Sequence, residues 1–108
     1  MSLVIRPIRP EDKSSWDSLF RSYFEFYETV PVDSSVERVW QRIASSPGEI
    51  QALVAELDGG VVGFAHFHYQ VSTWAEYGVC YLEDLFVLES VREHGVATAL
   101  ISEVKNIA

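Results

Sequence analysis

The amino-acid sequence predicts one domain of the α/β (α+β) class over residues 1 to 108, with helices flanking a mixed, mostly antiparallel sheet. Three observations predict it. Apolar side chains recur at helical spacing near both ends of the chain, two β-rich runs in the middle are joined by Asp58, Gly59 and Gly60, and a third β-rich run directly precedes the last helix. The 108 residues, 48% of them hydrophobic, suffice for one modest core.

The first strand is expected in the short β-rich run from Leu3 to Ile8. A helix should follow, because Pro10 suits the first helical position and acidic residues suit the first turn. Its apolar face is expected to continue to about Glu28. The side chains of this face are Trp16, Leu19, Phe20, Tyr23, Phe26 and Tyr27.

A second helix is predicted after Pro31, because Ser34 and Glu37 have the spacing of a capping box. Its buried stripe is expected to be Val36, Val39, Trp40 and Ile43. The runs from Ile50 to Leu57 and from Val61 to Tyr69 should then pair as a hairpin across the Asp-Gly-Gly turn.

The remaining elements are a loop from Gln70 to Gly78, which carries Trp74 and Tyr77, a strand from Val79 to Leu88, and a polar turn from Glu89 to His94. Apolar residues at helical spacing from Val96 to Ile107 predict the last helix. The sheet should therefore have about four strands.

Composition excludes several classes of function. The net charge of −8 opposes binding to a nucleic-acid backbone and weakly favours cationic ligands such as amines. Apolar runs are too short to span a membrane and no signal-peptide pattern is present, so a soluble, cytoplasmic protein is expected. Cys80 is the single cysteine, which excludes an internal disulfide; it is expected to be a buried strand thiol, with a nucleophile as the alternative.

The last turn and helix could hold phosphate groups. A helix start presents unpaired N–H groups and the positive end of its dipole, and Gly95 lets a ligand approach the main chain there. Arg92 adds a positive charge and Ala97 keeps the first helical turn small. An ordinary turn glycine before a packed helix is the alternative. His66 and His68 share a strand face, but with no third ligand nearby no metal site is expected.

The block from Tyr81 to Asn106 resembles the acyl-CoA motif of the GNAT superfamily of N-acetyltransferases, and Tyr-Leu-Glu-Asp at 81 to 84 resembles the diamine (spermidine/spermine) branch. This resemblance implies transfer of an acetyl group from acetyl-CoA to the primary amine of a small molecule, such as a polyamine, a diamine or an amino-acid-like compound. It also implies a GNAT-like fold and a homodimer. The cofactor-binding residues it implies are Phe86, Val87, Arg92, Glu93, His94, Gly95, Val96, Ala97 and Thr98.

Within this resemblance, residues 92 to 97 would wrap the pyrophosphate, and Phe86 and Val87 would offer backbone groups to the pantetheine arm. Many family members have Pro, Gly and Gly where this chain has Glu89, Glu93 and Ala97. The side chain of Glu93 is expected to face solvent.

Acetyl transfer needs a neutral amine, so a base must remove a proton from an ammonium group whose pKa is about 10.4. Glu83 is the matching residue in the diamine branch, and a structural carboxylate is the alternative. On a regular strand Glu83 and Asp84 would project to opposite faces, so only one is expected to serve the cleft. The residues expected to contact the amine are Glu25, Tyr27, Glu28, Trp74 and Asp84.

In the family a further strand, a helix and a hairpin follow the motif helix and supply a tyrosine proposed to protonate the leaving thiolate. The sequence is therefore expected to represent the N-terminal two-thirds of such an enzyme. The alternatives are that a second chain covers the last strand, or that the module is degenerate, a noncatalytic CoA-binding or dimerising unit.

Overall fold

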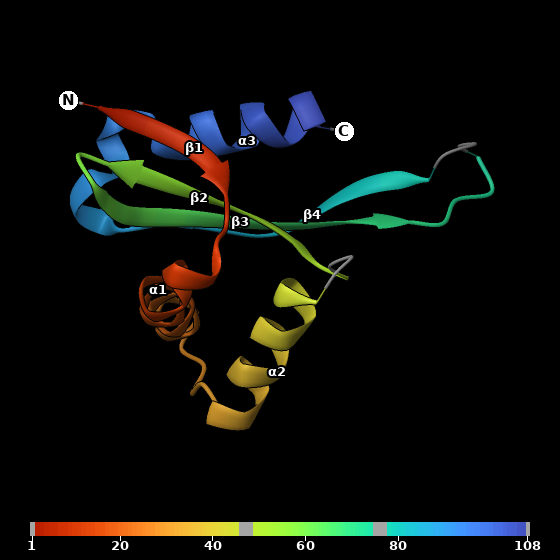
Figure 1. The fold of residues 1–108 in the computed structure, drawn as a ribbon, viewed down its shortest axis with the longest axis horizontal. Coiled ribbons are helices and arrows are strands. Elements are labelled where there is room, and N and C mark those ends of the chain that lie inside the picture. Colours follow the sequence, from red (N-terminus) through yellow and green to blue (C-terminus); the bar gives the residue numbers. More distant parts are fainter. Residues whose placement is uncertain (1, 46–48, 75–77, 108) are drawn as a thin grey trace.

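The computed structural model describes residues 2–45, 49–74 and 78–107, which form three layers. Helices α1 (Lys13–Phe26) and α2 (Asp33–Ala44) cover one face of the sheet and α3 (Val96–Ile107) covers the other (Figure 1). The strands are antiparallel neighbours in chain order, namely β1 (Leu3–Pro7), β2 (Gln51–Leu57), β3 (Gly60–Gln70) and β4 (Val79–Val87). Two short 3₁₀ helices, η1 (Pro10–Asp12) and η2 (Glu89–His94), precede α1 and α3. The predicted fold class is confirmed.

The predicted hairpin between β2 and β3 is confirmed. Asp58 and Gly59 both have positive φ, at 50° and 87°, which is the backbone shape of a two-residue type I′ turn. Leu57 and Gly60 pair across it. The turn fixes the register of β3, and with it the face to which each side chain of that strand points.

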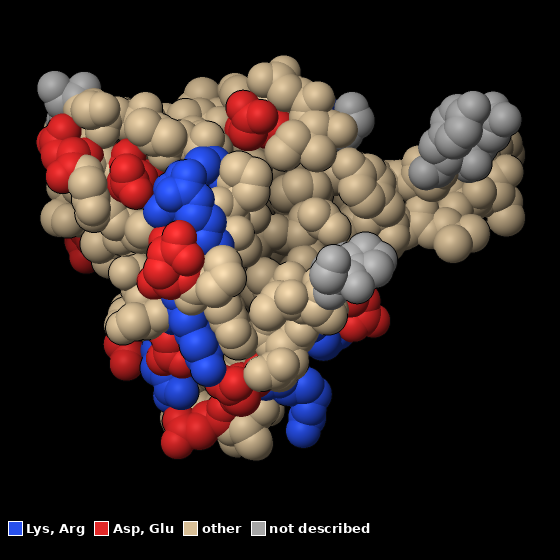
Figure 2. Space-filling model, in the orientation of Figure 1, with Lys and Arg blue, Asp and Glu red and all other residues tan. Residues whose placement is uncertain are grey.

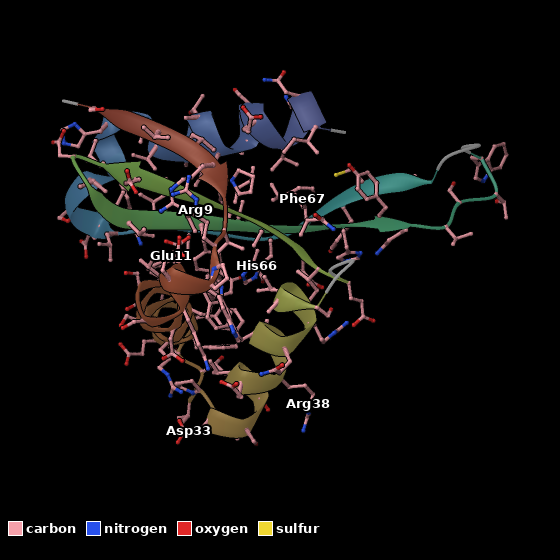
Figure 3. All side chains as sticks on the ribbon, viewed as in Figure 1. Arg9, Glu11, Asp33, Arg38, His66 and Phe67 are labelled. Carbon is pink, nitrogen blue, oxygen red and sulfur yellow. The ribbon has the colours of Figure 1, made fainter. Side chains whose placement is uncertain are left out.

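Two apolar clusters lie on the two faces of the sheet. The cluster toward α1 and α2 includes Trp16, Phe20, Val36, Trp40 and Phe64, and the cluster toward α3 includes Leu53, Ala65, Phe67, Val96 and Leu100. Figure 3 shows the alternation along β3, where His66 lies on the side of α1 and α2 and the next residue, Phe67, lies on the side of α3. Polar groups in β3 and β4 that face α1 are therefore the ones available to a shared site.

An ion pair fixes the start of α1 against the sheet. Arg6 of β1 donates to both carboxylate oxygens of Asp12, at 2.7 and 3.0 Å, and the N–H of Arg9 donates to the same carboxylate at 2.7 Å. The hydrogen bonds from Arg6 are the main reason that the pKa of Asp12 lies below its usual range, although burial opposes them. Because α1 begins at this clamp, its later turns cross β3 and β4 at a fixed place.

Two details of the helices differ from the prediction. Helix α2 begins at Asp33 after Val32, whose side chain makes no capping hydrogen bond, so Ser34 is not the cap. Glu37 instead contacts Lys13 of α1 at 2.9 Å, since an ion partner lies within its reach. Phe26, predicted on the apolar face of the first helix, is 57% exposed because α1 ends there, beside the outer edge of β4.

The remaining features concern single side chains and the surface. The Cys80 thiol is free and partly buried beside the α3 cluster, while Tyr77 lies outside the described residues. No helix in the described ranges is long and apolar enough to cross a membrane. On the face drawn in Figure 2, acidic and basic side chains intermingle over the half of the molecule that contains α1 and α2, so a polyanion finds no continuous basic surface there.

Candidate active site

A β-bulge interrupts β4 at its two adjacent carboxylates. His66 of β3 pairs with Asp84, but the next residue, Phe67, pairs with Leu82, so Glu83 is the extra residue of the bulged strand. Asp84 contacts His66, and Glu83 approaches His68, which follows His66 by two residues on the same face of β3. The prediction that Glu83 and Asp84 project to opposite faces is therefore wrong, because the bulge breaks the alternation and turns both toward α1.

Asp84 accepts hydrogen bonds from two sides. The Nδ1 atom of His66 lies 2.9 Å from its Oδ2 atom, and the hydroxyl of Tyr23 in α1 donates to its Oδ1 atom at 2.9 Å. On the far side of the imidazole, the indole N–H of Trp16 donates to His66 Nε2 at 2.9 Å. Four side chains from α1, β3 and β4 thus form one chain of hydrogen bonds.

The environment of Asp84 favours its charged form. Burial acts to raise the pKa of Asp84, but the hydrogen bonds from His66 and Tyr23 outweigh burial, and the pKa lies below the ordinary value of 3.8. The same geometry has the opposite effect on the phenol, since burial and the adjacent carboxylate raise the pKa of Tyr23. At neutral pH the pair therefore consists of a carboxylate and an intact phenol that donates to it.

Glu83 differs from its neighbour in both exposure and contacts. Its side chain is 47% exposed, and its described polar contact is 3.8 Å from Oε1 to Nε2 of His68, which is too long for a hydrogen bond. His68 itself packs against the ring of Tyr81, with ring centroids 5.3 Å apart. Glu83 is therefore a carboxylate that can exchange protons with an incoming ligand or with water.

A cavity of about 290 Å³ opens at the C-terminal end of β4, where the residues that follow the two carboxylates in the strand line it. One wall consists of Phe26 and Tyr27 at the end of α1, another of residues 85–87 of β4, and Arg92 and Ala97 complete the lining. Arg92 is fixed in this position, because its Nε donates to the carbonyl of Val87 at 2.9 Å and its guanidinium lies 5.0 Å from the centre of the Phe26 ring. The guanidinium of Arg92 and the backbone of residues 85–87 of β4 therefore border the cavity.

The open edge of β4 is set by strand geometry. The N–H of Leu88 donates to Val62 at 2.9 Å, and the carbonyl of Phe86 points at Gly63 of β3. Because successive residues of a strand point their backbone groups to opposite sides, the backbone of Val87 faces away from β3. Among the described residues no strand pairs with this side of β4; the carbonyl of Val87 accepts from Arg92, and the N–H of Val87 faces the open edge.

Gly95 forms the junction between η2 and α3. Its φ of +73° lies in the left-handed region, and nothing lies within 4 Å of the place where a Cβ would stand. The N–H of Ala99 donates to the carbonyl of Gly95 at 3.0 Å, which makes Gly95 the N-cap and leaves the N–H groups of residues 96–98 ahead of the helical ladder. The junction is thus an open cradle with main-chain donors at a helix start.

Comparison with known proteins assigns this arrangement to a family. Residues 15–108 match the model of the acetyltransferase (GNAT) family. The chain belongs to the GNAT family of acetyltransferases. It is 29% identical over 104 residues to a D-amino-acid N-acetyltransferase of Saccharomyces cerevisiae, an alignment covering 94% of this chain and 65% of the yeast protein. It is also 35% identical over 66 residues to a thialysine N-epsilon-acetyltransferase of Mus musculus, which covers 61% of this chain and 35% of the mouse protein.

Solved structures agree with the family assignment. The structure of AAC(6')-Iy in complex with the bisubstrate analog CoA-S-monomethyl-acetylneamine has a TM-score of 0.74 and 26% identity, and the match covers 98% of this chain and 71% of that one. In the two alignments above, the GNAT chain described here spans 65% of the length of the yeast relative and 35% of the length of the mouse relative.

The residues of this GNAT chain fit a bound CoA. The cradle at Gly95 would lose its open space to any Cβ, and the donors of residues 96–98 would face the diphosphate. Of the two strand residues expected to contact pantetheine, Val87 presents its backbone to the free edge, whereas the carbonyl of Phe86 is turned toward β3. The guanidinium of Arg92 lies over Phe26 and Phe86, so its charge sits at the cavity rather than in the cradle.

Other predicted cofactor residues occupy the same turn. His94 and Thr98 are exposed, Ala97 is partly buried at the cavity, and the side chain of Val96 is fully buried, so Val96 can contribute only main-chain groups. The side chain of Glu93 lies outside the described part of the structure, so its predicted orientation stays a prediction.

The residues predicted to contact the amine are only partly brought together. Tyr27 packs against Tyr23, with ring centroids 5.2 Å apart, while Glu25 and Glu28 are exposed at the end of α1. Trp74 is 97% exposed in the loop beyond β3. The pairing of Gln70 with Val79 places that loop at least five residues from Asp84, roughly 16 Å along the strand. The structure does not bring Trp74 to the carboxylates.

Sequence reasoning missed two members of the site, Tyr23 and His66. Tyr23 was assigned to the apolar face of the first helix, and His66 was considered only as a metal ligand. Both nitrogens of His66 are already bonded, and in the described ranges no three His, Cys, Asp or Glu side chains gather as a metal ion would require. A usable signal was present, because a histidine among core residues of a hairpin strand needs partners for both ring nitrogens.

Proposed function

We propose that this chain contains the site of an acetyl-CoA-dependent N-acetyltransferase that modifies the primary amine of a small molecule. One observation carries the proposal: two carboxylates in different environments lie on one face of β4, directly before the strand residues 85–87 that line a cavity. Membership of the GNAT family and the cradle at Gly95 support the same reaction class.

Cofactor binding is assigned to the turn before α3 and to the free edge of β4. The N–H groups of residues 96–98 would hold the diphosphate, and the N–H of Val87, whose carbonyl is bonded to Arg92, would donate to the pantetheine arm. Acetyl-CoA, when bound, supplies the acetyl group as a thioester. The apolar side chains of Phe26, Tyr27 and Leu85 would line the space beside the reacting end.

The two carboxylates are given different roles. Asp84, ionised and oriented by Tyr23 and His66, would hold the ammonium group of the substrate by charge and hydrogen bonding. Glu83, which is exposed and lacks a fixed donor among its described contacts, would take the proton that leaves the amine before it attacks. Holding and deprotonating the amine are then separate tasks.

The substrate class follows from the relatives and from charge. The yeast and mouse relatives are named for a D-amino acid and for thialysine, both small molecules that carry a primary amine. A site with two carboxylates in a protein of net charge −8 favours an amine with little negative charge, such as a diamine, a polyamine or a lysine-like side chain.

Turnover with a panel of amines tests the proposal in the full natural polypeptide. Acetyl-CoA is supplied with spermidine, thialysine or a D-amino acid, and acetylated product is measured by mass spectrometry together with the release of free thiol. At least one amine should give product and thiol in equal amounts. Tight CoA binding without product from any amine would refute the enzyme assignment.

The free edge of β4 favours one alternative, a noncatalytic CoA-binding module that dimerises through this edge. A homodimer is also compatible with the enzyme, so dimerisation alone does not decide between them. Sedimentation velocity with and without CoA measures the oligomeric state. A dimer that binds CoA and yields no product would establish the alternative.

A further inference from the structure

We infer that His66 is a positioning residue, held in one neutral tautomer by Trp16, which orients the carboxylate of Asp84 toward the amine. The inference rests on the proposed function, because it names how the amine-binding carboxylate of that site is held. Its first test is independent of activity.

The direction of each hydrogen bond follows from the groups involved. An indole N–H can only donate, so His66 Nε2, 2.9 Å from Trp16 Nε1, must be the unprotonated nitrogen. The ring proton of the neutral imidazole then lies on Nδ1 and is donated to Asp84. A second ring proton would point Nε2–H at the indole N–H, where no acceptor stands.

This arrangement excludes His66 as a base. Trp16 is fully buried and His66 is 1% exposed, so the imidazole meets solvent at neither nitrogen. The hydrogen-bond chain ends at Trp16, which cannot pass a proton on. What remains for His66 is to fix the position and charge of the carboxylate in front of it.

The packing supports an orienting role rather than mere filling of space. The imidazole packs against the rings of Phe20 and Phe64, with centroid distances of 5.2 and 4.5 Å, and these contacts restrict its rotation. The N–H of His66 Nδ1 therefore donates to Oδ2 of Asp84 from a fixed position, while the hydroxyl of Tyr23 donates to Oδ1 from α1. A carboxylate oriented before the ligand arrives loses less freedom on binding.

The tautomer is measured in the wild-type protein by two-bond ¹H–¹⁵N correlation spectra of the imidazole. We expect the proton on Nδ1 and a bare Nε2 nitrogen at neutral pH. A proton on Nε2, or on both nitrogens, would overturn the inference. This measurement needs neither cofactor nor substrate.

Two variants then separate positioning from packing. Both His66→Phe and His66→Asn remove the acceptor of Trp16, but only asparagine keeps an N–H close to the position of Nδ1. In His66→Phe we expect kcat/KM for the amine to fall about tenfold or more, with KM for acetyl-CoA changed less than about twofold. His66→Asn should recover most of the loss. Equal values for the two variants would reduce His66 to a packing residue.

The titration of Asp84 gives a second readout, followed by ¹³C NMR of its carboxyl group. Titratable groups facing Asp84 are Tyr23 from α1, His66 and His68 from β3, and Glu83 from its own strand. In His66→Phe the pKa of Asp84 should rise, because burial persists while one donor is lost. An unchanged titration would contradict the inference even in an inactive protein. If no amine is acetylated while the tautomer and titration are as expected, the proposed function fails and the positioning of Asp84 stands.

Discussion

The exchange Asp84→Asn removes the charge of the proposed amine-binding group while keeping its shape. The tautomer of His66 decides how the amide fits. Asparagine can turn its oxygen toward the N–H of His66 Nδ1 and its NH₂ group toward the hydroxyl of Tyr23, which can rotate to accept. Both hydrogen bonds survive as neutral ones, so the variant should fold.

The cost in stability can be worked out from these contacts. Two hydrogen bonds to a carboxylate contribute about 1.5–3 kcal/mol each, and two neutral ones about 0.5–1.5 kcal/mol each. The burial of the charge is itself unfavourable and is relieved in the variant. The free energy of unfolding should therefore fall by about 1–2 kcal/mol, which is about 5 °C in Tm per kcal/mol at this chain length.

The pH dependence of this loss has a definite sign. The pKa of Asp84 is lowered in the folded protein, so its contribution is fully present above the unfolded value of about 3.9 and is lost as the pH falls through the folded value. The gap between wild type and Asp84→Asn should be constant from about pH 8 to pH 5 and should close below about pH 4. Denaturant unfolding at several pH values measures it.

The functional effect should exceed the structural one. Loss of the charge facing an ammonium group should lower kcat/KM for the amine by about 10-fold to 100-fold, mainly through KM, with KM for acetyl-CoA almost unchanged. A stability loss above about 4 kcal/mol would contradict this fit, because it would mean that the hydroxyl of Tyr23 cannot rotate to accept and that the amide meets a donor on both sides. Wild-type kinetics toward the amine would refute the role of Asp84.

Three further substitutions test other parts of the site. Glu83→Gln should lower kcat by about 10²-fold or more and flatten the pH dependence of the rate, with the free energy of unfolding within about 0.5 kcal/mol of wild type; unchanged kinetics would exclude Glu83 as the base. Gly95→Ala should lower the free energy of unfolding by about 1–2 kcal/mol, because alanine is strained at φ +73°. It should also weaken CoA binding measured by calorimetry, and an unchanged Tm would contradict the strain. Phe26→Leu should lower Tm by only a few degrees, because Phe26 is 57% exposed. It should nevertheless weaken CoA binding, because Arg92 loses its contact with the aromatic ring, and a wild-type affinity for CoA would exclude a role of Phe26 in CoA binding.

The elements of the fold could be predicted because their signals are local. The turn at Asp58 and Gly59 needs two residues of positive φ, and few residue types accept that shape. Helix α3 has the bounds read from its apolar spacing, since one face packs on the sheet throughout. The predicted start of α2 is two residues late, because Glu37 has a partner in α1 that its own segment does not reveal.

The candidate site was less predictable because its members come from distant segments. Tyr23 and Asp84 are 61 residues apart in the chain, and Trp16 and His66 are 50 apart. Each residue by itself has an ordinary interpretation as a core aromatic or a strand histidine. Only the register of β3 against β4 and the crossing of α1 over both strands bring them together.

The bulge at Glu83 gives two neighbouring carboxylates different surroundings on one face of the sheet, which is the basis for proposing different tasks for them. In a regular strand one of them would have faced α3, among apolar side chains. With the extra residue both face α1, but only Asp84 reaches the donors of Tyr23 and His66. A carboxylate whose charge is stabilised by fixed donors is a weak base and a good cation ligand, whereas one without such donors is free to accept a proton. These contacts support the proposed assignment of Glu83 as base and Asp84 as ligand.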